Sequence, residues 1–134
     1  MFAAKGNTDS YITTSPMVFP TEDFDVGGMY DNSTGVATVP VDGKYQVHVM
    51  VYVRVDSGED MYPRVQVSTD SGSNWTSEVY SYVYNNAGTQ IHSTRSINVV
   101  LDLNANDQVR VVRGGSGDYY AGSQEHRFAM FLIG

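Results

Sequence analysis

The segment from Lys44 to Val55 alternates two kinds of residue with a strict period of two. Its apolar positions are Tyr45, Val47, Val49, Val51, Val53 and Val55. Because successive side chains of a β-strand point to opposite faces, this pattern predicts a long strand with one face in a sandwich core. The second face is mixed, and Met50 and Tyr52 are too large and apolar for exposure to solvent alone to explain them. We therefore expect a β-sandwich on one side of this strand and a further contact on the other.

The remaining sequence also favours strands. The chain has 19 Val and 10 Thr against 3 Leu, and β-branched side chains suit pleated sheets better than helices. Its 13 Gly, with many Ser, Asn and Asp, indicate tight turns. The expected strands are residues 10–14, 17–19, 28–30, 36–39, 44–55, 62–68, 77–84, 90–103, 108–113 and 125–133. A single all-β domain over residues 1–134 follows, with residues 1–8 as a flexible N-terminal arm.

Charge and cysteine content exclude several classes of protein. A net charge of −7 argues against a basic phosphate-binding surface, so we expect no nucleic-acid partner. The absence of cysteine excludes disulfides and thiolate metal sites. No segment approaches the ~18 consecutive apolar residues of a membrane helix, so no membrane insertion is expected. The N-terminus lacks a basic stretch followed by an apolar one, so we expect no signal peptide in this chain.

The last predicted strand is apolar on both faces. Phe128, Met130 and Leu132 alternate with Ala129, Phe131 and Ile133. A sandwich covers one face of a sheet, so the second face needs another partner. In a chain with no helix to cover it, a second copy of the same protein is the economical choice. The alternative is a central strand covered by a loop.

Two segments resemble the globular head of complement C1q and its relatives in the tumour necrosis factor superfamily. The first is FDVGGMYDNSTGVATVPVDGKYQV, and the second combines NDQVRVV with YAGSQEHRFAMFLI. The matching positions are Phe24, Asp25, Tyr30, Thr34, Gly35, Pro40, Gly43, Tyr45, Asp107, Gln108, Val109, Tyr120, Gly122, Phe128, Phe131 and Leu132. Asn106 and Met130 depart from the pattern, where the family has Gly, and the Ser57–Asp60 insert and the Trp75 segment have no clear counterpart.

The resemblance implies a ten-strand jelly-roll β-sandwich that assembles as a homotrimer, with the closing strand near the three-fold axis. The predicted trimer interface contains His48, Met50, Tyr52, Phe128, Phe131 and Ile133. Which face of the last strand meets the axis stays open.

The resemblance also implies a binding module that is not an enzyme. With no cysteine and a Thr-Glu-Asp-Phe-Asp entry, the chain looks most like the members found in bacteria and tailed phages. We therefore expect an extracellular or virion-surface role in attachment or decoration, through a cell-surface protein or glycan. A soluble carbohydrate-binding lectin is the alternative, and a glycan-processing enzyme is the third class.

Residues 68–75 match the Asp-box pattern Ser-x-Asp-x-Gly-x-Thr-Trp of sialidase propellers, except that Asn74 replaces Thr. A propeller needs four or more blades, and this chain has one box. We therefore predict a structural hairpin turn held by Ser68, Asp70 and Gly72, with Trp75 packed beneath it. An exposed Trp75 that stacks on a sugar is the alternative.

Catalysis finds no support in the residue pattern. There is no Gly-x-Ser-x-Gly segment and no His-Glu-x-x-His segment. Glu125 and His126 are neighbours in a strand and point to opposite faces, which argues against a cooperating pair. We predict no catalytic residues.

No cofactor is expected, although two metal sites are conceivable. One is a ring of three His48 side chains in a trimer. The alternative is that His48 is an interface histidine that is hydrogen-bonded to a neighbour. The other is a calcium site at Asp56, Glu59 and Asp60. The alternative is that these are solvated turn residues. For ligand binding, the flexible glycines of the segment GGSGDYYAGS present Tyr119 and Tyr120. Tyr120 matches a family position, so Tyr119 is the predicted ligand residue, together with Asp118 beside it.

Overall fold

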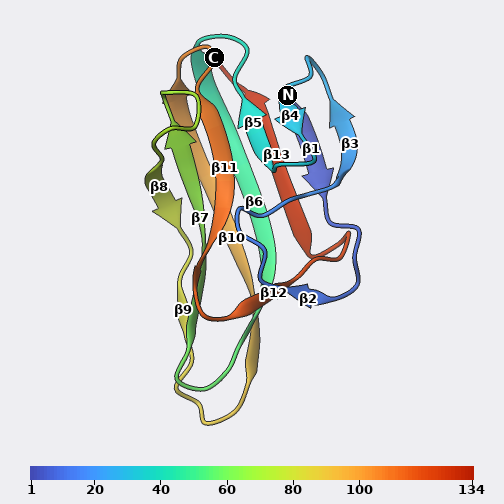
Figure 1. Ribbon diagram of the computed structural model, residues 1–134, viewed down its shortest axis with the longest axis vertical. Helices are drawn as coiled ribbons and strands as arrows, with labels where there is room; N and C mark the ends of the chain where they lie inside the picture. The colour runs from blue at the N-terminus through green and yellow to red at the C-terminus, as the bar shows by residue number, and fades with distance from the viewer.

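The computed structural model describes residues 1–134 as two curled antiparallel sheets packed face to face, without a helix. The strands are β1 (Phe2–Lys5), β2 (Tyr11–Ile12), β3 (Thr21–Asp25), β4 (Tyr30–Asp31), β5 (Val36–Thr38), β6 (Gly43–Val55), β7 (Asp60–Ser68), β8 (Thr76–Tyr80), β9 (Val83–Tyr84), β10 (Ile91–Leu103), β11 (Gln108–Gly115), β12 (Asp118–Tyr120) and β13 (His126–Leu132). Both chain ends lie at the upper end of the molecule in Figure 1. No helix in the structure has the length and apolar character needed to cross a membrane.

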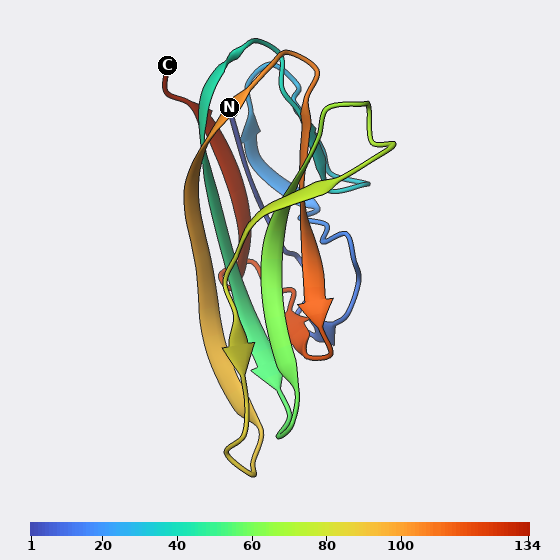
Figure 2. The same cartoon turned by 90° about the vertical axis from the view of Figure 1, so that its left-hand side faces the viewer.

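In sheet A, β13 and β12 pair with one edge of β6, and β10 pairs with its other edge. Strand β13 continues the sheet to β1 and β3, and β12 continues it to β2. Sheet B contains β4, β5, β11, β7 and β8, and β9 also pairs with β7. Figure 2 shows the two layers side by side, with β10 and β6 in one and β7 and β11 in the other. The all-β jelly-roll prediction is confirmed.

Strand β6 organises sheet A. It pairs with β10 over its whole length, and its other edge pairs first with β13 and then with β12. Its six alternating apolar side chains are at most 3% exposed, which confirms that this side of β6 faces the core. They pack against Val65 and Val67 of β7 and Val109 and Val111 of β11 in one continuous core.

The N-terminal segment is not a flexible arm, contrary to the prediction for residues 1–8. Strand β1 lies between β13 and β3, with hydrogen-bonded partners on both edges. Phe2 is fully buried; its ring stacks on Tyr30 at 4.5 Å and meets Phe128 edge-on at 5.0 Å, centroid to centroid. The prediction was wrong because four residues with one large apolar side chain give too short a pattern to indicate a strand.

Two motif residues hold the turns that lead into β4 and β5. Asp25 accepts hydrogen bonds from the backbone N–H groups of Met29 and Tyr30, at 2.9 and 3.0 Å. Gly35 has a φ of 79°, and a Cβ there would overlap the carbonyl oxygen of Met17. Glycine is therefore required at this position by both conformation and space.

Candidate functional site

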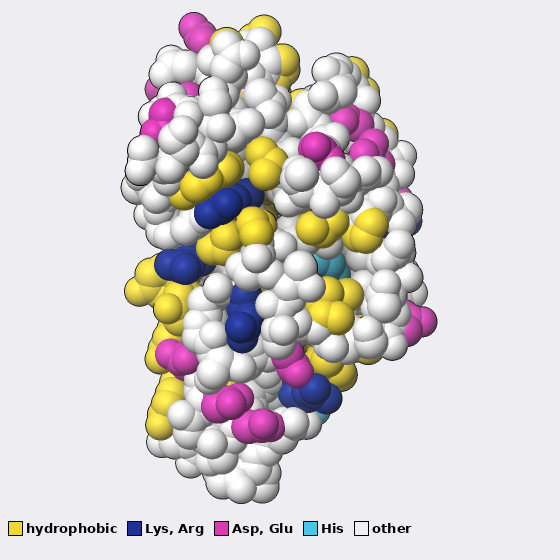
Figure 3. Space-filling model, in the orientation of Figure 1, with side chains coloured by type: hydrophobic (Ala, Val, Ile, Leu, Met, Phe, Trp, Pro, Cys, Tyr) yellow, Lys and Arg dark blue, Asp and Glu magenta, His cyan; other side chains and the backbone are white.

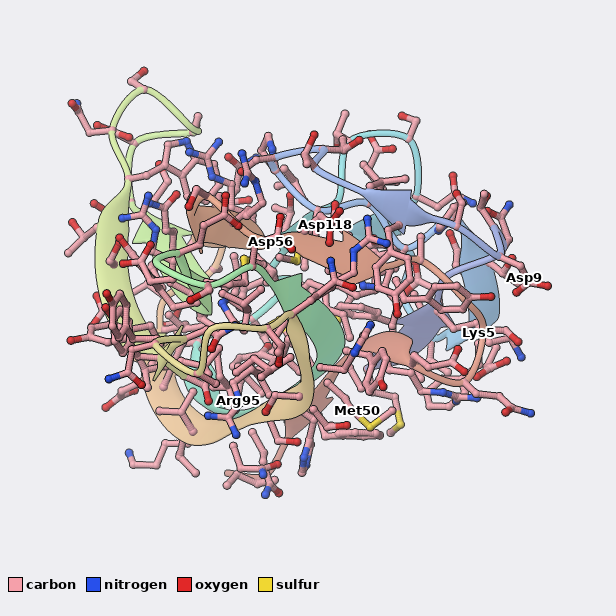
Figure 4. The ribbon with its side chains drawn as sticks, turned by 90° about the horizontal axis from the view of Figure 1, so that it is seen from below. Lys5, Asp9, Met50, Asp56, Arg95 and Asp118 are labelled. Carbon is pink, nitrogen blue, oxygen red and sulfur yellow. The ribbon has the colours of Figure 1, made fainter.

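The outer face of sheet A carries the mixed side of β6. We call it the β6 face, and it consists of Gln46, His48, Met50, Tyr52, Arg54, Ser96, Asn98, Arg127, Ala129 and Phe131. All five β6 side chains of this set are half-buried. His48 lies between Asn98 and Ala129 in the sheet, and Figure 4 shows Met50 projecting from the outside of the sandwich.

The β6 face is hollowed and partly aromatic. A hollow of about 270 Å³ lies beside His48 and Met50, where Ala3 and Ala129 are too small to fill the surface. The ring of Phe131 contacts that of His48 edge-on, with a centroid distance of 6.0 Å. An open, partly apolar depression of this kind is typical of a contact surface.

The predicted interface residues do not all share this face. His48, Met50, Tyr52 and Phe131 lie on it, and Ile133 follows the end of β13 with 54% of its surface exposed. Phe128 was wrongly assigned, because its side chain points inward and is fully buried. Of the two faces of the last strand, the one with Ala129 and Phe131 is therefore the outer face.

The predicted ligand residues of the GGSGDYYAGS segment are both engaged within the protein. Tyr119 is fully buried, and its hydroxyl donates to the carbonyl of Thr14 at 2.5 Å. Burial raises the pKa of Tyr119. Its prediction as a ligand residue was wrong, since Tyr119 and Tyr120 alternate and Tyr119 is the one that points inward. Asp118 forms a two-fold hydrogen-bonded ion pair with Arg54, with N···O distances of 3.0 and 2.6 Å.

The Asp-box segment forms the turn between β7 and β8. Asp70 accepts hydrogen bonds from Ser68 Oγ at 2.7 Å and from the Asn74 backbone and side-chain amides at 2.8 and 2.7 Å. These bonds lower the pKa of Asp70 to about 2. Trp75 donates from Nε1 to the Gly72 carbonyl at 3.1 Å. The indole is half-buried, and the Arg110 guanidinium lies 3.9 Å from the ring centroid and covers one face of the ring.

The three acidic residues proposed for calcium lie near one another but do not converge. Glu59 accepts a hydrogen bond from the backbone N–H of Asp56, and Asp60 accepts one from the hydroxyl of Tyr82. No group of three His, Asp or Glu side chains is placed to hold a metal ion. Asp56 and Asp118 both lie near the centre of the end view in Figure 4. A ring of His48 needs three copies of the chain and stays a prediction.

Sequence reasoning missed a second surface, on the outer face of sheet B. Tyr80, Tyr82 and Tyr84 are 60, 48 and 53% exposed, and they alternate within the segment predicted as a single strand. A run of tyrosines with a period of two on an exposed edge was the available signal. Exposed tyrosines gathered in one place are typical of binding surfaces.

The family model of the C1q domain matches residues 1–133. Among solved structures, Eiger TNF from S. frugiperda has a TM-score of 0.79 and 14% identity, covering 99% of this chain and 91% of that one. The globular domain of zebrafish complement 1qA protein has a TM-score of 0.72 and 19% identity, covering 99% and 96%. Murine APRIL at pH 5.0 has a TM-score of 0.77 and 8% identity, covering 98% and 97%.

Among curated protein sequences, none matches the chain. The solved structures are less than 25% identical to it and show the fold alone. The family model, in contrast, spans all residues but the last. The chain belongs to the C1q domain family.

Proposed function

We propose that this chain is a homotrimeric, non-enzymatic binding module that acts outside the cell by recognising a protein or glycan. Domains of the C1q and TNF families are typically trimeric, extracellular binding modules. The observation that carries the proposal is the β6 face, which is hollowed and partly apolar. Attachment or decoration on a phage virion or a bacterial surface is the setting we favour, and it rests on the family resemblance.

The charged residues at the rim of the β6 face are already paired. Lys5 Nζ lies 2.6 Å from Asp23 Oδ1, and Arg127 Nη1 lies 3.3 Å from Asp23 Oδ2. A charged group that enters an interface without a partner carries a large desolvation penalty. Pairing of both cations to one carboxylate reduces that penalty, which favours burial of this face against other copies.

A lectin remains the second candidate, because the exposed rings of Tyr80 and Tyr82 offer flat apolar faces to sugars. A glycan-processing enzyme is the least favoured class. Turnover assays on acidic and neutral oligosaccharides are expected to show no product.

The trimer is tested by the mass of the protein in solution. We expect light scattering to give about three times the 14.7 kDa of one chain. Met50→Arg should shift the mass to that of one chain, because Met50 lies on the β6 face and the new charge would enter the interface without a partner.

The matched control is Thr69→Arg, which adds the same charge at an exposed position in the β7–β8 turn and should leave the trimer intact. Circular dichroism verifies that both variants are folded. A wild-type mass of 14.7 kDa at micromolar concentration would exclude the trimer.

A further inference from the structure

A hollow of about 320 Å³ opens on the outer face of sheet B, where β7 pairs with β8. We call it the tyrosine hollow, and its lining consists of Asp60, Tyr62, Arg64, Ser77, Tyr80 and Tyr82. The three β7 residues lie two positions apart and so share one face of the strand. Tyr80 of β8 lies directly opposite Arg64. The volume falls at the small end of the range for ligand pockets, about 300–1,000 Å³.

Three aromatic rings form the walls of the tyrosine hollow. The ring centroid of Tyr62 lies 5.5 Å from that of Tyr80 and 5.5 Å from that of Tyr82. Tyr80 and Tyr82 expose about half of their surface or more. A sugar ring presents C–H groups on its faces, and these pack against aromatic rings while its hydroxyls stay at the edge. The walls therefore fit a sugar better than an extended apolar ligand.

The walls are held in place by the surrounding strands. Tyr62 lies across Gly114, its direct partner in β11, and a Cβ at that glycine would overlap the ring. The Tyr82 hydroxyl donates to Asp60 Oδ2 at 3.1 Å, and Arg95 Nη1 donates to the Tyr82 carbonyl at 3.2 Å. A site that is already ordered loses less entropy when it binds.

Arg64 has no acidic partner. Four of the eight basic residues form ion pairs, and all four belong to strands of sheet A: Lys5, Lys44, Arg54 and Arg127. Arg64 makes no ion pair, and its Nε is buried without a hydrogen-bond partner. Its Cζ lies 5.8 Å from the centroid of Tyr62, at the wall of the hollow. The guanidinium therefore has no acidic group of its own chain to neutralise it, and its fork of N–H groups matches a carboxylate.

A second arginine adds to the positive potential of this face. Arg110 of β11 donates from Nε to Gln66 at 2.9 Å. Burial and the nearby charge of Arg64 lower the pKa of Arg110. Figure 3 shows basic side chains among hydrophobic ones over β7 and β11. An anion bound at Arg64 would offset the repulsion between the two guanidinium groups.

We propose that the tyrosine hollow binds a carboxylated sugar of an acidic glycan. The Arg64 guanidinium holds the carboxylate, the rings of Tyr80 and Tyr82 pack on the sugar, and Asp60 accepts hydroxyl groups at the other end. The Asp60 carboxylate favours a sugar over an acidic peptide, since it repels a second anionic group and accepts a hydroxyl. This proposal rests on the proposed function, because it names the ligand class of that binding module.

The test is the binding of wild-type protein to an array of uronic-acid and sialic-acid oligosaccharides, each beside its carboxyl methyl ester. We expect binding to carboxylated glycans that is at least tenfold tighter than to the esters. Arg64→Gln and Tyr80→Ala should each weaken this binding at least tenfold. The Tyr80 variant is informative even if Arg64→Gln unfolds, because the Tyr80 ring is largely exposed.

The matched control is Lys44→Gln, which removes one positive charge on sheet A from an exposed side chain. Its affinity for the same glycans should stay within twofold of the wild type. Equal binding to acid and ester, equal binding to poly-glutamate, or no effect of Arg64→Gln in a folded protein would each overturn the proposal. Light scattering on the same samples separates the two proposals, because a trimer that binds no acidic glycan refutes only the tyrosine hollow.

Discussion

Phe2→Ala is expected to lower the free energy of unfolding by about 3–5 kcal/mol, the usual cost of removing a buried aromatic ring. Phe2 is fully buried and packs against Tyr30 and Phe128. Its loss leaves a cavity where β1, β4 and β13 meet. The measurement is denaturation by guanidinium chloride at neutral pH, at one fixed protein concentration, because association contributes to the stability of an oligomer.

The matched control is Tyr84→Ala, which also removes an aromatic ring, but one with 53% of its surface exposed. Surface substitutions of this kind usually change stability by about 0.5 kcal/mol or less. If the free energy of unfolding fell equally in both variants, Phe2 would not be packed in the core. The contrast therefore measures directly whether the first residues are part of the domain.

The difference between β6 and β1 shows which part of this fold the sequence can predict. Six alternating apolar residues on β6 define a face without reference to any partner. Strand β1 has only Phe2 and Ala4 facing inward, and its order comes from pairing with β13 and β3, which are distant in the sequence. Strand β3 was missed for the same reason, since TEDFD is polar and mostly exposed. Short strands are specified by their neighbours.

The same limit applies to the candidate sites. Both faces of the last strand are apolar, so only its register with β6 decides which face is the outer one. That register places Phe128 opposite Val49 in the core and Ala129 opposite His48 outside. The tyrosine hollow depends on the pairing of β7 with β8, in which the register shifts between Val65 and Gln66. No local sequence pattern predicts the register of β13 with β6 or that of β7 with β8.

Acidification is expected to destabilise the protein through His126. The ring is fully buried, stacked 3.9 Å from Phe19 and 5.0 Å from Tyr119, centroid to centroid. Its Nε2 lies 3.1 Å from the carbonyl oxygen of Val18, and its Nδ1 has no partner. The neutral ring therefore donates one hydrogen bond, whereas the protonated ring would carry an unpaired N–H in an apolar site. Burial lowers the pKa of His126 to about 4.

The folded and unfolded states of the chain bind a proton at His126 over different pH ranges. In the unfolded chain the His126 pKa is 6.5, so the unfolded state takes up a proton below that pH and the native state does not until about pH 4. Stability is therefore complete above pH 6.5 and falls as the pH is lowered toward 4. The full loss is about 3 kcal/mol, at 1.36 kcal/mol per pH unit. Between pH 7 and pH 5, about 2 kcal/mol of it should be lost.

Denaturation by guanidinium chloride at pH 7 and at pH 5 measures this loss, and His126→Phe should remove most of it because the variant has no group to titrate at this position. The measurement stays at or above pH 5 because the contribution of Asp70 to stability, with its pKa of about 2, is lost only at lower pH. His92→Gln is the control, because it removes a histidine from the exposed side of β10. If His126→Phe kept the full pH dependence, or His92→Gln removed it, the buried ring of His126 would not be the source of that dependence.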